Sequence, residues 1–200
     1  MKRILLMALL AVAFPLAAFA NSVEFSNMGG TLTGSSAGLT LTGSELSGVV
    51  GLGGNGPVVG DLGTVTFTTG SLLSGNLATD AVFNSGGSFT ITGNGTNGVP
   101  DGVLYSGSFT STVTWAYSST LSNGSEVFDI SGEISGGSTM QAYAVVGSNG
   151  FTQVYGTLGS GNTTISSTVP EPGTLALLGT GLAAAVRRKK LFTGKSTPPL

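Results

Sequence analysis

The chain has 200 residues, of which 40% are hydrophobic and 8% charged, and it contains neither Cys nor His. These absences exclude disulfides, thiolate and Ser-His nucleophiles and His-bearing metal sites. All basic residues lie near the two ends, and every charged residue of the segment between them is acidic. This segment therefore cannot neutralise phosphate groups, which excludes nucleic acid as a partner. Carboxylate pairs and oxygen-ligand cation sites are the catalytic devices that remain.

Residues 1–20 have the pattern of a secretory signal peptide. A basic start precedes an apolar run at 4–19, and Ala18 and Ala20 place small residues at positions −3 and −1 of a cleavage site. The run is shorter than the roughly 20 residues of a membrane-spanning helix, and Pro15 interrupts it. We therefore expect passage through the Sec machinery and removal by signal peptidase after Ala20.

Residues 21–168 form the body of the chain, which is long enough for one domain with a hydrophobic core. More than half of them are Gly, Ser or Thr. Disordered segments are poor in aromatic and β-branched residues, whereas here Val, Ile, Phe, Tyr and Thr are plentiful and regularly placed. The composition therefore predicts a folded β protein rich in small residues.

The first half of the body contains short stretches of period-two alternation at 39–42, 65–68 and 88–92, which predict strands. Between the first two, residues 51–56 match G-x-G-x-x-G by letter. A dinucleotide site needs a helix to begin at the last glycine, but residues 57–60 (Pro-Val-Val-Gly) predict a turn and a strand. We interpret the motif as a glycine loop.

Residues 94–102 form a polar loop whose carbonyl groups and single carboxylate, that of Asp101, could contact a cation. Calcium loops bring several carboxylates, and neither an EF-hand pattern nor a repeated glycine–aspartate nonapeptide occurs in the sequence. We therefore predict no metal site and no cofactor.

Residues 103–117 alternate between apolar and small polar residues, which predicts one long or bent strand with Gly107 or Ser111 at the bend. The apolar face carries four aromatic residues, namely Tyr105, Phe109, Trp115 and Tyr117. We interpret this face as part of the core. The alternative is an exposed platform on which sugar rings stack.

The second half of the body reads as a meander, because Asn-Gly or Gly-Gly pairs at 123–124, 136–137 and 149–150 predict tight turns. They separate predicted strands at 127–134, 140–146 and 151–158. The body is therefore predicted to be all-β, an antiparallel β-sandwich or partly closed β-barrel of about 8–10 strands. A β-solenoid competes, but the sequence shows no fixed repeat period.

Glu126, Asp129 and Glu133 are the only cluster of acids in the body. On a strand, Asp129 and Glu133 would share a face about 13 Å apart, whereas the two carboxylates of a glycosidase lie roughly 5–10 Å apart. We interpret them as a solvated face, and we predict no catalytic residue and no enzymatic activity.

The C-terminal segment combines Pro170, Glu171 and Pro172 with an apolar run at 174–186. A basic cluster follows, made up of Arg187, Arg188, Lys189 and Lys190. As a helix the run would span about 20 Å, against a hydrocarbon core of about 30 Å, so we predict a short, transient transmembrane helix. The basic cluster stops transfer, which leaves residues 191–200 as a cytoplasmic tail and the body outside.

In this combination and order, residues 169–190 resemble the sorting tail of bacterial PEP-CTERM proteins. The resemblance implies a membrane-embedded exosortase as partner, which removes the tail and passes the body to the cell surface or extracellular matrix. It indicates an exported structural protein, with extracellular polysaccharide as a further candidate partner. A surface adhesin or carbohydrate-binding module is the alternative function, and a carboxylate-dependent glycan hydrolase is the third.

Overall fold

The computed structural model describes residues 22–54, 56–149 and 152–166, which belong to one compact unit that spans Asn21–Thr168. These residues form an antiparallel sheet of twelve strands, so the all-β prediction is confirmed and the predicted strand number was too low. Among the described residues, no helix is long and apolar enough to cross a membrane. The apolar run at 174–186, predicted as a short transmembrane helix, lies outside them.

The elements follow one another along the chain with short connections. They are β1 (Ser22–Ser35), β2 (Gly38–Val50), η2 (Leu52–Gly54), β3 (Val58–Val59), β4 (Gly63–Thr68), β5 (Leu72–Gly75), β6 (Ala81–Phe83), β7 (Gly86–Asn94), β8 (Asp101–Phe109), β9 (Val113–Thr120), β10 (Glu126–Ile134), η3 (Ser135–Gly137), β11 (Ser138–Asn149) and β12 (Gln153–Ser166).

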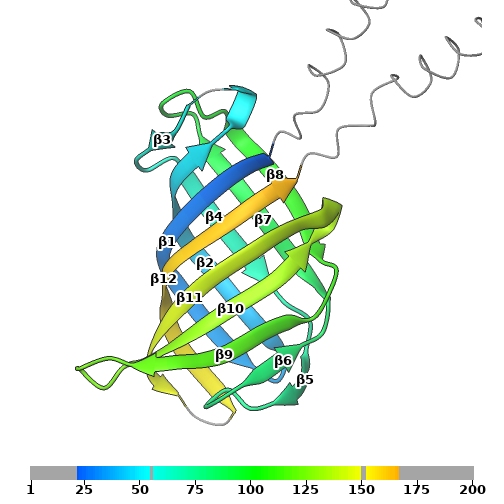
Figure 1. Cartoon of the computed structure of the whole chain (residues 1–200), viewed down its shortest axis with the longest axis vertical. Helices are drawn as coiled ribbons and strands as arrows, with labels where there is room; N and C mark the ends of the chain where they lie inside the picture. Colours follow the sequence, from blue (N-terminus) through cyan, green and yellow to red (C-terminus); the bar gives the residue numbers. More distant parts are fainter. Residues whose placement is uncertain (1–21, 55, 150–151, 167–200) are drawn as a thin grey trace, which may run out of the picture. The chain divides into compact units, whose positions relative to one another are not determined.

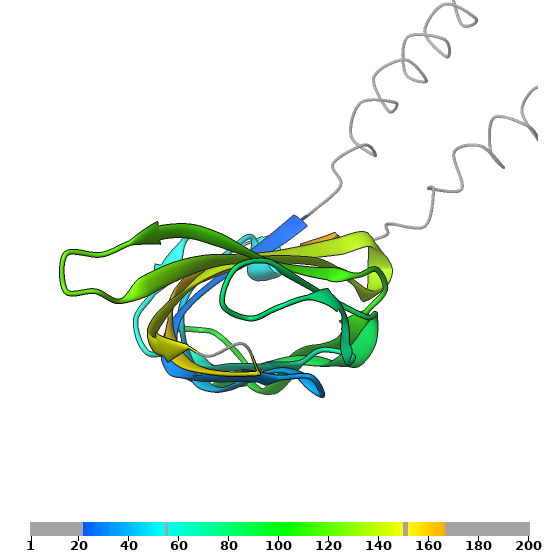
Figure 2. The same cartoon turned by 90° about the horizontal axis from the view of Figure 1, so that it is seen from below.

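The pairings close eight of the strands into a ring, in the order β10-β11-β12-β1-β2-β4-β7-β8 and back to β10. Strands β9, β6 and β5 branch from β10, and β3 pairs with β2. Figure 1 shows the strands running obliquely around the body, and Figure 2 shows the ring end-on. This topology corresponds to the partly closed barrel of the two predicted alternatives, because a sandwich would have separate sheets.

The ring closes through few bonds between β8 and β10. Phe109 pairs with Ile134, and the backbone N–H of Thr110 donates a hydrogen bond of 2.9 Å to the carbonyl oxygen of Glu133. Beyond this point η3 replaces the strand, since the hydroxyl of Ser135 accepts from the N–H of Ser108 at 3.1 Å. The rest of β8 therefore has a regular strand partner only on the side of β7.

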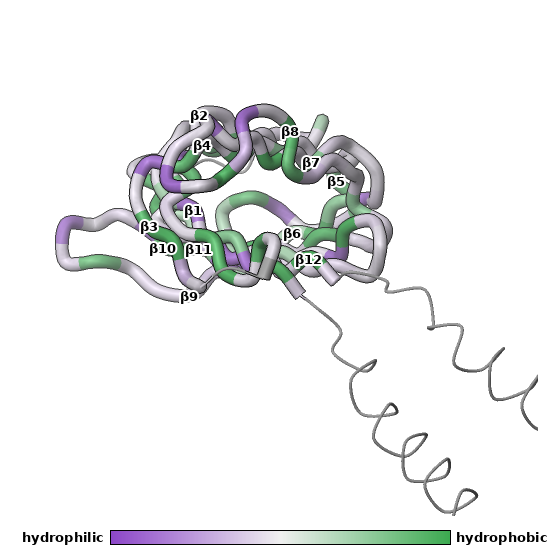
Figure 3. Tube along the Cα trace, turned by 90° about the horizontal axis from the view of Figure 1, so that it is seen from above, coloured by the Kyte–Doolittle hydropathy of each residue, from purple (hydrophilic) through white to green (hydrophobic). Residues whose placement is uncertain are grey.

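Alternation between small polar and apolar residues explains why these segments form strands around a core. In β4, Val65 and Phe67 are buried while Thr64, Thr66 and Thr68 face outward. The ring of Phe67 stacks on that of Phe89 from β7, with centroids 6.2 Å apart. Figure 3 shows the same pattern, with hydrophobic residues recurring at intervals along the strands.

The long strand predicted at 103–117 is two strands, β8 and β9, and the break at residues 110–112 includes the predicted bend at Ser111. One extra residue in β8 shifts its register against β7 between Tyr105 and Val103. Such a bulge changes the phase of the alternation, so side chains on the two sides of the extra residue no longer follow one pattern of faces. For this reason Val103, predicted to lie on the apolar face, is 66% exposed.

The β5–β6 segment crosses one end of the ring, which is visible from below in Figure 2. Leu77, between these strands, is completely buried, and its carbonyl oxygen accepts a 3.2 Å hydrogen bond from the indole N–H of Trp115. The indole stacks on Phe128, with ring centroids 4.4 Å apart. This end of the core is therefore filled by side chains.

Candidate functional site

The acids singled out by the sequence lie along β10. Asp129 and Glu133 are exposed, as predicted for a solvated face, and Glu126 is half-buried. No group of three or more acidic residues in the described part of the chain could hold a metal ion. Asp129 and Glu133 are therefore surface carboxylates.

The predicted aromatic face divides between core and surface. Phe109 and Trp115 are buried, so the core interpretation is confirmed for them, whereas Tyr117 is 45% exposed. Tyr105 is half-buried, and its hydroxyl donates a 2.7 Å hydrogen bond to the carbonyl oxygen of Ser135. Burial raises the pKa of this phenol above its ordinary value. These residues do not form a shared exposed platform.

Hydrogen bonds connect the polar loop at 94–102 to Asp61, which lies between β3 and β4. The amide of Asn94 donates to the backbone carbonyl oxygen of Asp61 at 3.1 Å, and the hydroxyl of Thr96 donates to the same oxygen at 2.9 Å. Within the loop, the side-chain oxygen of Asn94 accepts a 3.2 Å hydrogen bond from the backbone N–H of Thr96, so one oxygen atom that a cation would need is already engaged. We find no geometry here that favours a metal.

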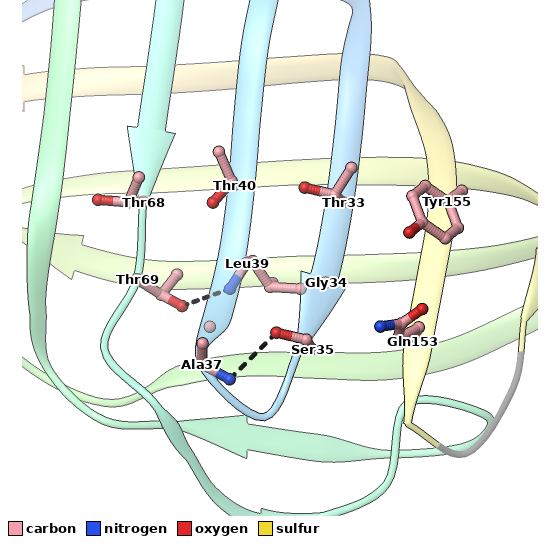
Figure 4. Close-up of a pocket in the computed structure, with 11 residues that line it drawn as sticks. Thr33, Gly34, Ser35, Ala37, Leu39, Thr40, Thr68, Thr69, Gln153 and Tyr155 are labelled. Atoms are coloured by element: carbon pink, nitrogen blue, oxygen red, sulfur yellow. Dashed lines mark hydrogen bonds between the residues drawn. The ribbon is translucent and has the colours of Figure 1, made fainter.

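The candidate site lies instead on the outer face of β12, β1, β2 and β4. The backbone register places Tyr155 opposite Thr33, Thr33 opposite Thr40, and Thr40 opposite Thr68. We call these four residues the hydroxyl row, and Figure 4 shows them side by side across the four strands. Neighbouring strands are about 4.8 Å apart, so the hydroxyl groups repeat at roughly that interval.

A hollow of about 470 Å³ lies against the hydroxyl row, a size typical of small-ligand sites. Its other side includes Gln153, Ser35 and Thr69, which lie at the ends of β12 and β1 and just after β4. Gly38 also lines the hollow and packs closely against the backbone of Thr69 and Gly70. A Cβ atom at this glycine would come within 2.7 Å of the carbonyl oxygen of Gly70, so a larger residue would not fit.

The polar groups of the hollow fall into two kinds. Thr69 is structural, since its hydroxyl accepts from the N–H of Leu39 and donates to the carbonyl oxygen of Gly70, both at 2.9 Å. The side chains of Thr33, Thr40 and Tyr155 make no hydrogen bond to any other residue that the structure describes. Tyr155 is also 60% exposed, so its ring and hydroxyl can contact a ligand.

The sequence analysis did not predict this site, although a pattern of threonines in the sequence indicates it. Thr-x-Thr with an apolar central residue occurs at 31–33, 40–42, 64–66, 66–68, 90–92 and 112–114. Such triplets predict a strand with hydroxyl groups on one face, but only the register shows that the strands are neighbours. Thr66, for example, pairs with Thr90.

The C-terminal end of the chain matches a known family model. Residues 168–190 match the family model of the PEP-CTERM protein-sorting motif. The chain carries a PEP-CTERM sorting motif. Searches of curated proteins and of solved structures found no significant match.

The PEP-CTERM motif confirms the resemblance seen in the sequence, and it begins two residues after β12 ends at Ser166. It implies an exported protein with a C-terminal membrane anchor that an exosortase processes. The residues assigned to sorting, Pro170, Glu171 and Pro172, lie outside the described residues. The same holds for the predicted signal-cleavage residues Ala18 and Ala20 and for the basic cluster Arg187, Arg188, Lys189 and Lys190.

Proposed function

We propose that the chain is a non-enzymatic structural protein of the cell surface or extracellular matrix. The PEP-CTERM motif carries this proposal, because it implies export and exosortase processing immediately after the β body. The absence of Cys and His from the sequence supports a non-enzymatic role, as does the exposure of Asp129 and Glu133 on one face of β10. The protein reaches the surface through a transient membrane stage.

The intact mass of the protein released from its producing cells tests this proposal. We expect a chain that begins at Asn21 and lacks residues 187–200. Replacing Glu171 with Ala should leave the tail attached and hold the protein in the membrane fraction. The matched control is Glu133→Ala, which removes an exposed carboxylate from the body and should not change the mass beyond the substitution. A released wild-type chain that still carries residues 187–200 would refute processing.

A non-enzymatic role makes a separate prediction. The protein should not hydrolyse glycans. A variant in which Glu126, Asp129 and Glu133 are changed to their amides should give the same result as the wild type in the hydrolysis assay. Glycan hydrolysis that disappears in these variants would establish the carboxylate-dependent hydrolase instead.

A carbohydrate-binding surface is the second candidate function. It is favoured by the exposed ring of Tyr155 beside a hollow lined with hydroxyl and amide groups. Sugars are bound by such combinations of an aromatic ring with hydrogen-bonding side chains. A surface protein of this kind would hold matrix polysaccharide.

A further inference from the structure

We propose that the hydroxyl row and the hollow beside it bind an uncharged glycan chain laid across strands β12, β1, β2 and β4. The inference rests on the second proposed function and assigns it a site and a ligand class. Tyr155 provides the ring on which a sugar stacks. Thr33, Thr40 and the amide of Gln153 provide hydrogen bonds to sugar hydroxyl groups.

The repeat of the row favours a polymer over a single small molecule. Thr68 extends the row to Ser88 on β7, since their hydroxyl oxygens are 3.0 Å apart and the residues pair in register. Five strands at about 4.8 Å spacing give a row roughly 19 Å long. A glycan presents hydroxyl groups at regular intervals over such a length, whereas a free monosaccharide would contact only part of it.

The charges favour a neutral glycan over an acidic one. None of the residues that line the hollow is charged. The sequence between Arg3 and Arg187 has no basic residue, so the body cannot pair with a uronate or a sulfate group. Its acids instead repel an anionic polymer, and this repulsion weakens as salt screens it.

The threonine side chains also suit a glycan ligand, because each can make both polar and apolar contacts with a sugar. The hydroxyl both donates and accepts hydrogen bonds, while the methyl group can contact the apolar face of a sugar ring. Thr33, Thr40 and Thr68 are half-buried, so their rotamers are partly fixed by the neighbouring strands before binding. A pre-ordered row loses less side-chain entropy when the glycan binds.

The hollow lies far from the C-terminal end of β12, at which the body continues into the sorting segment. Ser35 pairs with Gln153 at the hollow, whereas Ser22 pairs with Ser166 at the other end of the same β1–β12 ladder. The thirteen-residue separation along β1 corresponds to roughly 40 Å. The hollow thus lies at the end of the body opposite to the residue from which the sorting segment continues.

Affinity electrophoresis of the full chain in gels that contain a soluble polysaccharide tests the site. Hydroxyethyl cellulose, dextran and a soluble β-1,3-glucan serve as neutral probes, and alginate serves as the acidic probe. We expect at least one neutral probe to retard the wild-type chain and alginate not to. Tyr155→Ala should weaken retardation about tenfold or more, and Thr40→Val by roughly three- to tenfold through loss of one hydroxyl group.

Matched controls separate the site from general effects on the fold. Tyr143→Ala removes another tyrosine, which is 41% exposed and lies outside the hollow. Thr66→Val removes the hydroxyl group of another outward-facing threonine of β4, which pairs with Thr90 and does not line the hollow. Both should keep wild-type retardation. Circular dichroism and thermal melting of all four variants show whether each is folded, and Thr40→Val, which keeps the side-chain shape, tests the site even if Tyr155→Ala does not fold.

The possible outcomes distinguish the site from the function on which it rests. Retardation by a neutral probe that survives both Tyr155→Ala and Thr40→Val would overturn the site and leave carbohydrate binding standing. Retardation by alginate alone would overturn the neutral ligand class. No retardation by any probe would overturn the site and the carbohydrate-binding function together, while exosortase processing would still be decided by the intact mass.

Discussion

Replacing Leu77 with Ala tests whether the β5–β6 segment seals one end of the core. Leu77 is completely buried, and its carbonyl oxygen holds the indole of Trp115. Removing a buried leucine side chain costs about 2–5 kcal/mol, because apolar contacts are lost and a cavity remains. With about 3 kcal/mol as the central value, Tm should fall by roughly 6–12 °C for a domain of this size.

The matched control is Leu73→Ala in β5, because Leu73 is 55% exposed and lies four residues away. This change should alter the free energy of unfolding by no more than about 0.5 kcal/mol. Trp115 is the only tryptophan and is retained in both variants, so its fluorescence reports unfolding in urea. Equal losses in the two variants, or a loss below about 1 kcal/mol for Leu77→Ala, would refute the packing of this segment into the core.

Three further predictions concern the body. Burial raises the pKa of Tyr105, so the stability that its protonated phenol provides is present below about pH 10 and is lost as the pH rises further. In urea titrations at pH 7 and 11, Tyr105→Phe should therefore lose less stability between the two pH values than the wild type does. At pH 7 the variant should be less stable by about 1 kcal/mol, because the hydrogen bond of the phenol is lost. Gly63→Ala should cost several kcal/mol in thermal melts, because φ is +144° and a Cβ would clash with a β7 carbonyl group, whereas Gly147→Ala, with open space, should be nearly neutral. Trypsin should leave the segment between Arg3 and Arg187 uncut even after denaturation, as seen by gel and mass, and a Glu-specific protease should fragment it; a tryptic cut inside the segment would contradict this.

Period-two alternation predicted most strands of the second half of the body, and the Asn-Gly and Gly-Gly pairs predicted turns between them. The predicted hairpin at 123–124 is present, with Gly124 at φ +85° as such turns require. The first strand, β1, was missed, and β12 continues to Ser166 beyond the predicted end at 158. Both segments contain positions where the register shifts, such as Gly29 opposite Leu158, so the alternation changes phase within them.

The candidate site could not be predicted because it depends on pairing between distant segments. Thr33 and Tyr155 are far apart in sequence and become neighbours only through the register of β1 with β12. The aromatic residues were the stronger signal in the sequence, but bulk and hydrophobicity place Trp115 in the core. Tyr155 follows a buried valine in an otherwise polar stretch, and nothing local distinguishes it from a core tyrosine.

The pairing of β1 with β12 sets an order of events for the folding of the exported chain. β1 is the first described strand and β12 the last, and they pair along nearly their whole length. During synthesis or translocation the ring cannot close until residue 166 is available, so most of this long-range pairing forms late, and non-local pairing of this kind is intrinsically slow. The sorting motif begins two residues later, and completion of the body therefore coincides with delivery of the segment that the exosortase recognises.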